Sequence, residues 1–248
     1  MMDPAKNEML FGIRPLLEAL RSGETIEKII IQKDLQGDLF RELNQALKKV
    51  EKIPLQMVPK EALNKLSKDN HQGIVAFISP IKFVSVEKKV MELNDEGKTP
   101  FVLVLDHITD VRNFGAIIRS AEAMGVNLII TPIKGSARVN AEAIKSSTGA
   151  IFNIPLARES NLIDVVDLLK ALGIKIASAT EKGQVDIQDA NLTGPIALVM
   201  GSEEKGITKS ILKRSDMRVR IPLAGKTESL NVSVATGIVL YEINRQSR

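Results

Sequence analysis

Asn113 and Arg119 lie six positions apart in the segment DHITDVRNFGAIIRSAEAMG. Their amide and guanidinium groups can hydrogen-bond a ligand, and the guanidinium also carries a positive charge. On one continuous helix this separation would place them about 240° apart around the axis, so they would not share a face. We therefore expect Asn113 to cap the helix from the preceding loop, with Arg119 one turn above Gly115 on the same face. Gly115 would then leave room for a ligand beside the guanidinium. The alternative is that Asn113 is only a helix cap and Arg119 only a surface residue.

A second segment, IALVMGSEEKGI, runs from an apolar strand into a loop that contains Gly201 and Gly206. A phosphate-binding Walker loop requires Lys and then Ser or Thr after its second glycine, but here Ile207 follows Gly206, so that type of loop is excluded. The glycines are instead typical of a loop whose backbone a ligand can approach closely. A plain strand-to-helix turn with exposed Glu203 and Glu204 is the alternative.

A third segment, RIPLAGKTESLNVSVATGIVLYE, places Ser229 and Asn231 at the start of a helix, on either side of Leu230. Capping accounts for one such polar residue, and the presence of two indicates a further role. The helix that follows is apolar on most of its sides. We therefore expect it to be buried against the core or against a partner.

The other polar side chains of the first segment do not form a familiar catalytic set. Asp106, His107 and Asp110 cluster there, but no Ser or Cys stands at a nucleophile turn, so a catalytic triad is not supported. We interpret His107 and His71 as structural residues. No group of side chains resembles a metal site.

The composition is that of an ordinary globular protein. Hydrophobic residues make up 44% and charged residues 26% of the 248 residues. No apolar run approaches the ~20 residues of a membrane-spanning helix, and the opening MMDPAKNEM lacks the apolar stretch of a signal peptide. The absence of cysteine excludes disulfides, thiolate zinc clusters and cysteine nucleophiles. We therefore expect a cytoplasmic protein.

The net charge of +4 and the pI near 9.2 allow a polyanionic partner without requiring one. Neither half is a basic arm, because residues 1–98 hold 16 basic and 15 acidic residues and residues 99–248 hold 18 and 15. Aromatic residues make up only 3%, so any RNA contact should depend on charge and shape rather than on stacking. The densest basic cluster is either a solvated helix face or an RNA-binding surface. Its members are Lys205, Lys209, Lys213, Arg214, Arg218 and Arg220, interrupted by Asp216.

Helical and strand patterns alternate through the first part of the chain, which predicts a small α/β domain over residues 1–80. The polar, Lys- and Glu-rich residues 81–98 are expected to form a helical connector and linker. The expected elements are a helix at 11–21, a strand at 28–31, a helix at 37–50, a strand at 55–58, a helix at 59–66 and a strand at 73–78.

A second domain is expected over residues 99–248, beginning with the buried-strand pattern FVLVL. Strands interleaved with helices predict an α/β fold with a mostly parallel sheet that is covered on both faces. The expected strands are 101–105, 127–131, 174–178, 196–200 and 219–221. The expected helices are 114–124, 141–147, 162–172 and 230–245.

In this order and at these strand ends, the three polar segments resemble the three motifs of the SpoU family of RNA ribose 2′-O-methyltransferases, members of the SPOUT superfamily. The resemblance covers roughly residues 99–248. The front half, with FGIRPLLEALRSG and HQGIVAFIS, is similar to the small, ribosomal-protein-like domain with which such enzymes bind their substrate. This domain layout is most similar to the branch that methylates a guanosine of large-subunit (23S-type) ribosomal RNA.

The resemblance implies properties that the residue patterns do not predict by themselves. It implies a deep trefoil knot in the C-terminal part of the sheet, which general topology rules would argue against. It also implies a homodimer with the C-terminal helix in a two-fold interface, and S-adenosylmethionine as the methyl donor. The positions implied to hold this cofactor are Gly201, Ile221 and Leu230, with Thr131 and Thr180 as further neighbours.

The catalytic group that the resemblance implies consists of Asn113, Arg119, Glu203, Ser229 and Asn231. Methyl transfer is an in-line displacement, so catalysis should come mainly from placing the 2′-oxygen and stabilising its developing charge. Arg119 suits the second task, although a guanidinium is too basic to remove a proton by itself. Glu203 is the more ordinary proton acceptor, and the others would orient Arg119 and the ribose.

The chain departs from the family pattern at two positions. Val111 stands where proline is common, and Glu204 stands where glycine is common; neither change removes a proposed catalytic group. Other functions stay open at this point. The substrate could be a transfer RNA guanosine, the chain could be a noncatalytic RNA-binding ribosome assembly factor, or it could be a phosphate-handling α/β enzyme, which the failed Walker loop disfavours.

Overall fold

The contacts within the chain divide it into two compact units. Unit 1 is Met1–Lys82 together with Arg138–Ala141, and unit 2 is Phe83–Ala137 together with Glu142–Arg248. The structure is a computed structural model, and each unit is described by itself. The residues that it describes are 9–48, 50, 53–66, 70–227 and 229–247.

Unit 1 is a four-stranded sheet in the order β1-β4-β2-β3, in which β4 is antiparallel to both neighbours and β2 is parallel to β3. Alternate side chains of β2 face opposite sides of this sheet. Ile29 and Ile31 pack with α1 and α2, whereas Ile30 packs with Leu63 of α3. The elements are β1 (Met9–Phe11), α1 (Ile13–Arg21), β2 (Ile26–Gln32), α2 (Asp38–Leu47), β3 (Leu55–Val58), α3 (Lys60–Leu66) and β4 (Ile74–Ile78).

Unit 2 is built on a seven-stranded parallel sheet in the order β7-β6-β5-β10-β8-β11-β9. Its strands are β5 (Phe101–Asp106), β6 (Leu128–Pro132), β7 (Leu156–Glu159), β8 (Lys175–Ala179), β9 (Val185–Asp186), β10 (Ile196–Gly201) and β11 (Met217–Arg220). Its helices are α4 (Val86–Asp95), α5 (Val111–Ala123), α6 (Ala141–Ser146), the short 3-10 helix η2 (Ala150–Phe152), α7 (Leu162–Ala171), α8 (Lys209–Arg214) and α9 (Val232–Gln246).

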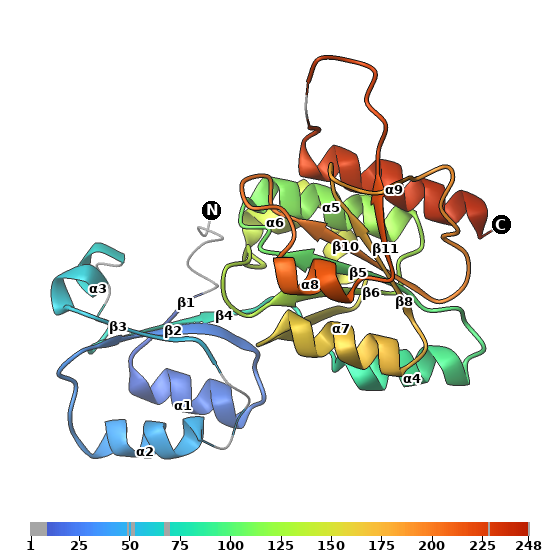
Figure 1. The fold of residues 1–248 in the computed structure, drawn as a ribbon. Coiled ribbons are helices and arrows are strands. Elements are labelled where there is room, and N and C mark those ends of the chain that lie inside the picture. The colour runs from blue at the N-terminus through green and yellow to red at the C-terminus, as the bar shows by residue number, and fades with distance from the viewer. Residues whose placement is uncertain (1–8, 49, 51–52, 67–69, 228, 248) are drawn as a thin grey trace. The chain divides into compact units, whose positions relative to one another are not determined.

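Helices cover both faces of this sheet (Figure 1). On one face, Val102 and Val104 of β5 pack in a core that includes residues of α4, α7 and α8. Leu103 and Leu105 point to the opposite face, which α5 and α9 cover side by side. The predicted fold class, an α/β protein with a small N-terminal domain and a C-terminal parallel sheet, is confirmed.

The sequence patterns missed five short elements: β1, η2, β7, β9 and α8. Each spans only two to six residues, too few for a helical or strand period to stand out. In the stretch expected to be a linker, helix α4 buries Val86 and Val90 in the core of unit 2. The trefoil knot stays a prediction.

Candidate active site

Helix α5 carries the first polar segment, and Asp110 rather than Asn113 caps it. Asp110 Oδ1 accepts hydrogen bonds from Arg112 N at 2.9 Å and from Asn113 N at 2.8 Å. The expectation that Asn113 is the cap was wrong, because the carboxylate three residues earlier already satisfies the free N–H groups of the first turn. Asp110 itself was the available signal, since aspartate is a preferred N-cap residue. Asn113 is therefore free to use its side chain elsewhere.

Gly115 serves helix packing rather than ligand binding. A β-carbon at this position would lie 1.9 Å from Ser146 Oγ and 2.9 Å from the carbonyl oxygen of Ala143, both on α6. The expectation that Gly115 leaves room for a ligand was wrong, because α6 fills that space. The glycine allows α5 and α6 to approach each other closely.

Asn113, Glu203 and Asn231, one residue from each polar segment, form a hydrogen-bonded cluster. Asn231 Nδ2 donates to Glu203 Oε1 at 2.8 Å and to Asn113 Oδ1 at 3.0 Å. Asn113 Nδ2 lies 3.4 Å from Glu203 Oε1. The fold thus joins the start of α5, the loop after β10 and the start of α9 at one polar point.

This cluster also holds the first turn of α9 in place. Glu203 Oε1 accepts from Val232 N at 3.0 Å, and Asn231 Oδ1 accepts from Ser233 N at 2.9 Å. A negative carboxylate is favourable at a helix N-terminus because the free N–H groups carry partial positive charge. Glu203 Oε1 therefore already receives three donors, which makes it well suited to fixing the geometry of its neighbours.

The structure leaves Arg119 and Ser229 outside this cluster. Both are exposed, Arg119 on α5 and Ser229 just before α9. Within the described residues, no hydrogen bond or ion pair is made by either side chain. A guanidinium without a protein partner can bind a phosphate or a developing negative charge.

The positions implied to hold the cofactor divide into two groups. Thr180, Gly201 and Ile221 lie at or just beyond the carboxyl ends of β8, β10 and β11, three strands that are neighbours in the sheet. Ligands of open parallel sheets bind at this edge. Leu230 is half-buried just before α9. Thr131 stands apart, because it lies on β6, is 1% exposed and directs its hydroxyl to the carbonyl oxygen of Ala157.

The loop after β10 turns tightly, and Gly201 makes this possible. A β-carbon on Gly201 would lie 2.2 Å from the carbonyl carbon of Gly206 and 2.3 Å from Ile207 N. The loop therefore folds back on its own strand end, with an antiparallel bridge between Ser202 and Gly206. Two half-buried aliphatic residues come from other segments: Ile221 directly follows β11, and Leu230 precedes Asn231, which bonds Glu203 of this loop. Backbone groups together with apolar side chains are the usual lining of a site for a small organic ligand.

Comparisons with known proteins identify both parts of the chain. The SpoU rRNA Methylase family matches residues 100–241, and the family described as RNA 2′-O ribose methyltransferase substrate binding matches residues 9–84. The chain belongs to the SpoU family. It is an RNA ribose 2′-O-methyltransferase. The SpoU methyltransferase AviRb from Streptomyces viridochromogenes, 26% identical, has been solved in complex with the cofactor AdoMet, with a TM-score of 0.59 over 96% of this chain and 89% of that chain.

Relatives of this SpoU enzyme are similar over different shares of its length. A Staphylococcus haemolyticus protein, whose name places it in the TrmH family of tRNA/rRNA methyltransferases, is 34% identical and covers 96% of this chain and 95% of the relative. The AdoMet-bound rRNA methyltransferase from Sinorhizobium meliloti is 25% identical, with a TM-score of 0.60 over 96% of this chain and 87% of that chain. The TrmH/SpoU tRNA modifying enzyme of A. aeolicus is 29% identical, with a TM-score of 0.54 over 64% of this chain and 83% of that chain.

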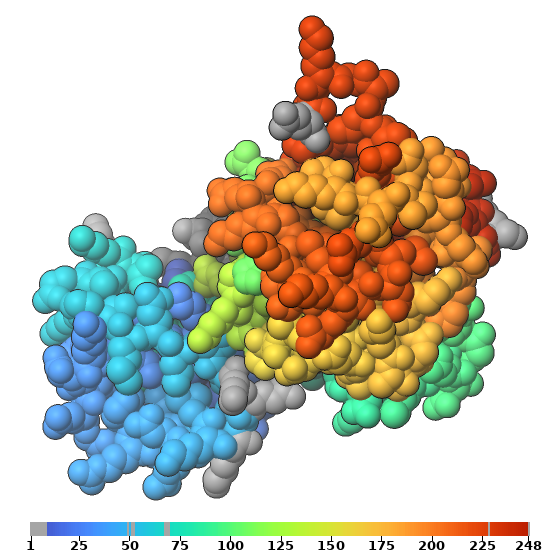
Figure 2. Space-filling view, viewed as in Figure 1, coloured from blue at the N-terminus to red at the C-terminus, as the bar shows by residue number. Residues whose placement is uncertain are grey.

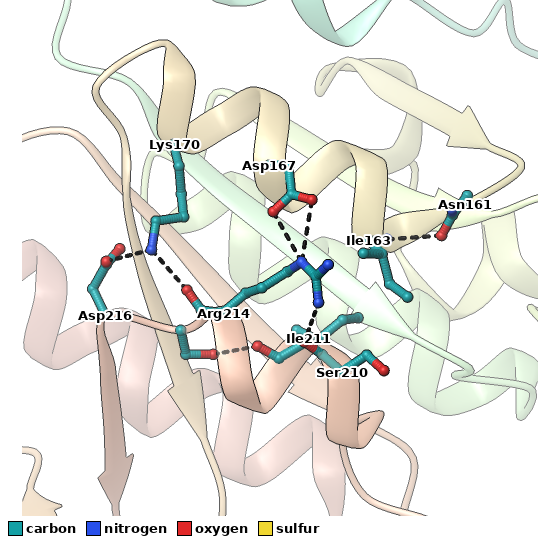
Figure 3. A network of polar contacts seen from close by, with 9 residues as sticks. Asn161, Ile163, Asp167, Lys170, Ser210, Ile211, Arg214 and Asp216 are labelled. Atoms are coloured by element: carbon teal, nitrogen blue, oxygen red, sulfur yellow. Dashed lines mark hydrogen bonds and ion pairs between the residues drawn. The ribbon is translucent and has the colours of Figure 1, made fainter.

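The basic cluster of this SpoU enzyme is in large part structural. Arg214 Nε donates to both oxygens of Asp167 at 3.0 and 3.1 Å, and Arg220 Nε donates to Asp186 at 2.6 Å. Arg218 Nε donates to the carbonyl oxygen of Leu212. Figure 3 shows the Arg214 contacts between α7 and α8. The lysines differ: Lys205, Lys209 and Lys213 are exposed, and among the described residues they have no ion-pair partner.

Asp216 completes this network. Its Oδ1 accepts from Lys170 Nζ at 2.7 Å (Figure 3). Its Oδ2 accepts from Ile176 N at 2.8 Å. Burial by itself would raise the pKa of Asp216, but the hydrogen bonds from Lys170 and Ile176 and the charge of Lys170 together lower that pKa below its usual value. The network therefore fastens α7 to β8 and to the start of β11.

The described residues include neither a membrane-spanning helix nor a metal site. None of their helices is long and apolar enough to cross a membrane. In the same part of the chain, no group of three or more His, Asp or Glu side chains is placed to hold a metal ion.

Proposed function

We propose that this SpoU enzyme methylates the ribose 2′-hydroxyl of a guanosine in large-subunit ribosomal RNA. The observation that carries the proposal is a complete substrate-binding unit in front of the methyltransferase unit. The rRNA methyltransferase of S. meliloti matches 96% of this chain, whereas the tRNA modifying enzyme of A. aeolicus matches only 64%. In this proposal residues 1–80 bind the RNA, residues 81–98 connect, and residues 99–248 bind the cofactor and carry the reaction.

Arg119 is the residue that we propose acts on the reacting atoms. When bound, S-adenosylmethionine supplies an electrophilic methyl group. The exposed guanidinium of Arg119 would hold the phosphate next to the target ribose and stabilise the charge that develops on the 2′-oxygen. Ser229, also exposed and before α9, would hydrogen-bond the ribose from the other segment.

Glu203, Asn113 and Asn231 are proposed to position these groups. The three donors to Glu203 Oε1 come from Asn113, Asn231 and Val232, so this oxygen is engaged in holding α5 to α9. This favours a positioning role for Glu203 over the role of proton acceptor that its chemistry alone would suggest.

The cofactor site is proposed to comprise Thr180, Gly201, Ile221 and Leu230, at the edge where β8, β10 and β11 end. The trefoil knot of the family is also part of the proposal, in the region where β10 lies between the earlier strands β5 and β8. Thr131 is left out of this proposed set because its hydroxyl is buried and bonded to Ala157.

A homodimer through α9 is part of the proposal. Val234, Ile238 and Tyr241 follow each other at helical spacing and are 53%, 37% and 58% exposed. An apolar stripe of this kind on the last helix is suited to a two-fold contact with a second copy. We further propose a cytoplasmic location, where ribosomal RNA is available and a chain without cysteine is at no disadvantage.

The experiment uses labelled S-adenosylmethionine with the purified protein and either protein-free large-subunit ribosomal RNA or total transfer RNA. The labelled nucleotide is then mapped by mass spectrometry. We expect label on the ribose of a guanosine in the ribosomal RNA. Label in transfer RNA alone would contradict the substrate, and label on a base would contradict the ribose. Sedimentation of the wild-type protein and of Tyr241→Glu tests the dimer.

A further inference from the structure

Asp106 and His107, directly after β5, form a pair that the proposed reaction does not use. Asp106 is 1% exposed, and its Oδ1 lies 2.5 Å from His107 Nδ1. Its Oδ2 accepts a hydrogen bond from Thr208 N at 2.7 Å. The imidazole itself is open to solvent, with half of its side-chain surface exposed. A buried carboxylate thus holds an exposed ring.

The pairing determines what the far side of the ring can do. An ionised carboxylate only accepts hydrogen bonds, so His107 Nδ1 must carry the proton that it shares with Asp106. In the neutral ring, Nε2 is then an acceptor that points away from Asp106. His71, the other histidine of the chain, differs because both of its nitrogens are engaged, Nε2 with Asn64 and Nδ1 with Gly73 N.

The backbone and its surroundings hold His107 in an unusual conformation. Its φ is +61°, in the left-handed region that residues with a β-carbon rarely adopt. Gly135 packs against the ring, since a β-carbon there would lie 2.8 Å from His107 Cδ2 and 3.4 Å from Nε2. Strained positions that their surroundings maintain are concentrated at functional sites.

The pair lies at the same sheet edge as the candidate active site. Asp106 is in register with Gly201 on the neighbouring strand β10, and Thr208, which binds Asp106, ends the loop that contains Glu203. An RNA substrate bound at this edge would lie near the loop after β5, because that loop begins at the same edge. Phosphate oxygens only accept hydrogen bonds, so they are not partners for an acceptor nitrogen. The donor that every ribonucleotide carries is the 2′-hydroxyl.

We propose that His107 Nε2 accepts a hydrogen bond from a ribose 2′-hydroxyl of the bound RNA, and that Asp106 and Gly135 position the ring for this contact. This inference depends on the proposed function, because it needs an RNA substrate at the carboxyl edge of the sheet. The hydroxyl belongs either to a neighbouring nucleotide or to the target itself. His107 is accordingly a substrate-contacting residue and Asp106 a positioning residue.

The test compares His107→Gly, which tolerates a φ of +61°, with His107→Gln, whose side-chain amide keeps an acceptor at the reach of Nε2. Steady-state methylation is measured on an RNA fragment that contains the mapped target. We expect the glycine variant to lose about tenfold in kcat/KM, the size of one lost hydrogen bond, and the glutamine variant to recover most of it. Asp106→Asn should match the glycine variant, because an amide donating to Nδ1 turns Nε2 into a donor.

Single 2′-deoxy substitutions in the fragment identify the hydroxyl. If a neighbouring nucleotide supplies it, one substitution weakens the wild type about tenfold and leaves His107→Gly unchanged. If the target supplies it, no flanking substitution matters and the glycine variant loses kcat rather than KM. Either result supports the inference.

Equal kcat and KM in His107→Gly and wild type would overturn the inference. A loss of S-adenosylmethionine affinity and thermal stability in parallel with activity would also overturn it, since that describes a purely structural residue. A wild-type protein that methylates neither RNA would instead refute the proposed function, so the two failures can be told apart.

Discussion

Two polar regions of unit 2 use similar residues in opposite ways. In the network between α7, α8 and the start of β11, two cations are paired with carboxylates: Arg214 with Asp167, and Lys170 with Asp216. In the cluster at the start of α9, Glu203, Asn113 and Asn231 are hydrogen-bonded to one another. Arg119 lies on the same helix as Asn113 but has no hydrogen-bond or ion-pair partner among the described residues. An arginine that is paired with a carboxylate stabilises the packing of its helix, whereas an arginine without a protein partner remains available to bind a substrate.

The largest effect is expected from Arg119→Ala, which removes the arginine that has no partner among the described residues. We expect methyl transfer to fall by about 10²–10³-fold, the usual loss when a group that stabilises transition-state charge is removed. The affinity for S-adenosylmethionine, measured by calorimetry, should stay within about twofold. Arg214→Ala is the matched control, because it removes an arginine from the paired network and should leave kcat close to that of the wild type. Full activity in Arg119→Ala would contradict the assignment.

Two substitutions of Glu203 test its role, because one keeps and the other removes the oxygen that accepts hydrogen bonds from Asn231 and Val232. Glu203→Ala removes the acceptor for Asn231 and Val232, and we expect kcat to fall by about 10–100-fold through loss of positioning. Glu203→Gln retains an acceptor oxygen and should lose less. A rapid-quench assay of both variants over pH 6–9 checks this. An equal loss in both variants would indicate that the carboxylate takes up a proton instead.

Helix α9 begins at the polar cluster, with Asn231 as its N-cap, and carries a paired carboxylate, Glu242, near its end. Hydrogen bonds from Arg245 and Gln246 lower the pKa of Glu242 to about 2, against the opposing effect of burial. Its ordinary pKa is 4.5, so this carboxylate stabilises the fold above that pH and the stabilisation is lost as the pH falls from about 4.5 to about 2. Glu242→Gln should lower the free energy of unfolding at pH 7 by on the order of 2 kcal/mol. Thermal unfolding at pH 7 and pH 3 should show this difference shrinking; a constant difference would rule out the ionised form as the cause.

The smallest effect is expected from the paired network. Asp216→Asn keeps an acceptor for Ile176 N but loses the charge that Lys170 contacts, so stability should drop by about 1 kcal/mol. Methylation kinetics should not change. Chemical denaturation measures the free energy of unfolding, and the standard methylation assay measures kcat and KM. A large fall in kcat without a fall in stability would show that the network takes part in the reaction.

The sequence alone predicted the secondary elements whose apolar pattern is long, among them β5, α5, α7 and α9. It also predicted the three polar segments, because their residue types are unusual for surface turns. It could not predict short elements such as β9, nor that α6 would occupy the space beside Gly115. Helix contacts of that kind depend on residues about thirty positions apart, Gly115 and Ser146 among them, and no local pattern reports them.

The family, the parallel α/β architecture and the three polar segments can all be predicted from the amino-acid sequence, because residue types and their periods are local properties. Only the tertiary structure decided that Asn113 meets Glu203 and Asn231 while Asp110 takes over the cap. It likewise showed that the arginines of the basic cluster are hydrogen-bonded, whereas its lysines have no ion-pair partner among the described residues. The physical reason is that hydrogen bonds and ion pairs require atoms within about 3–4 Å, and for segments far apart in sequence the strand order alone decides which atoms come so close.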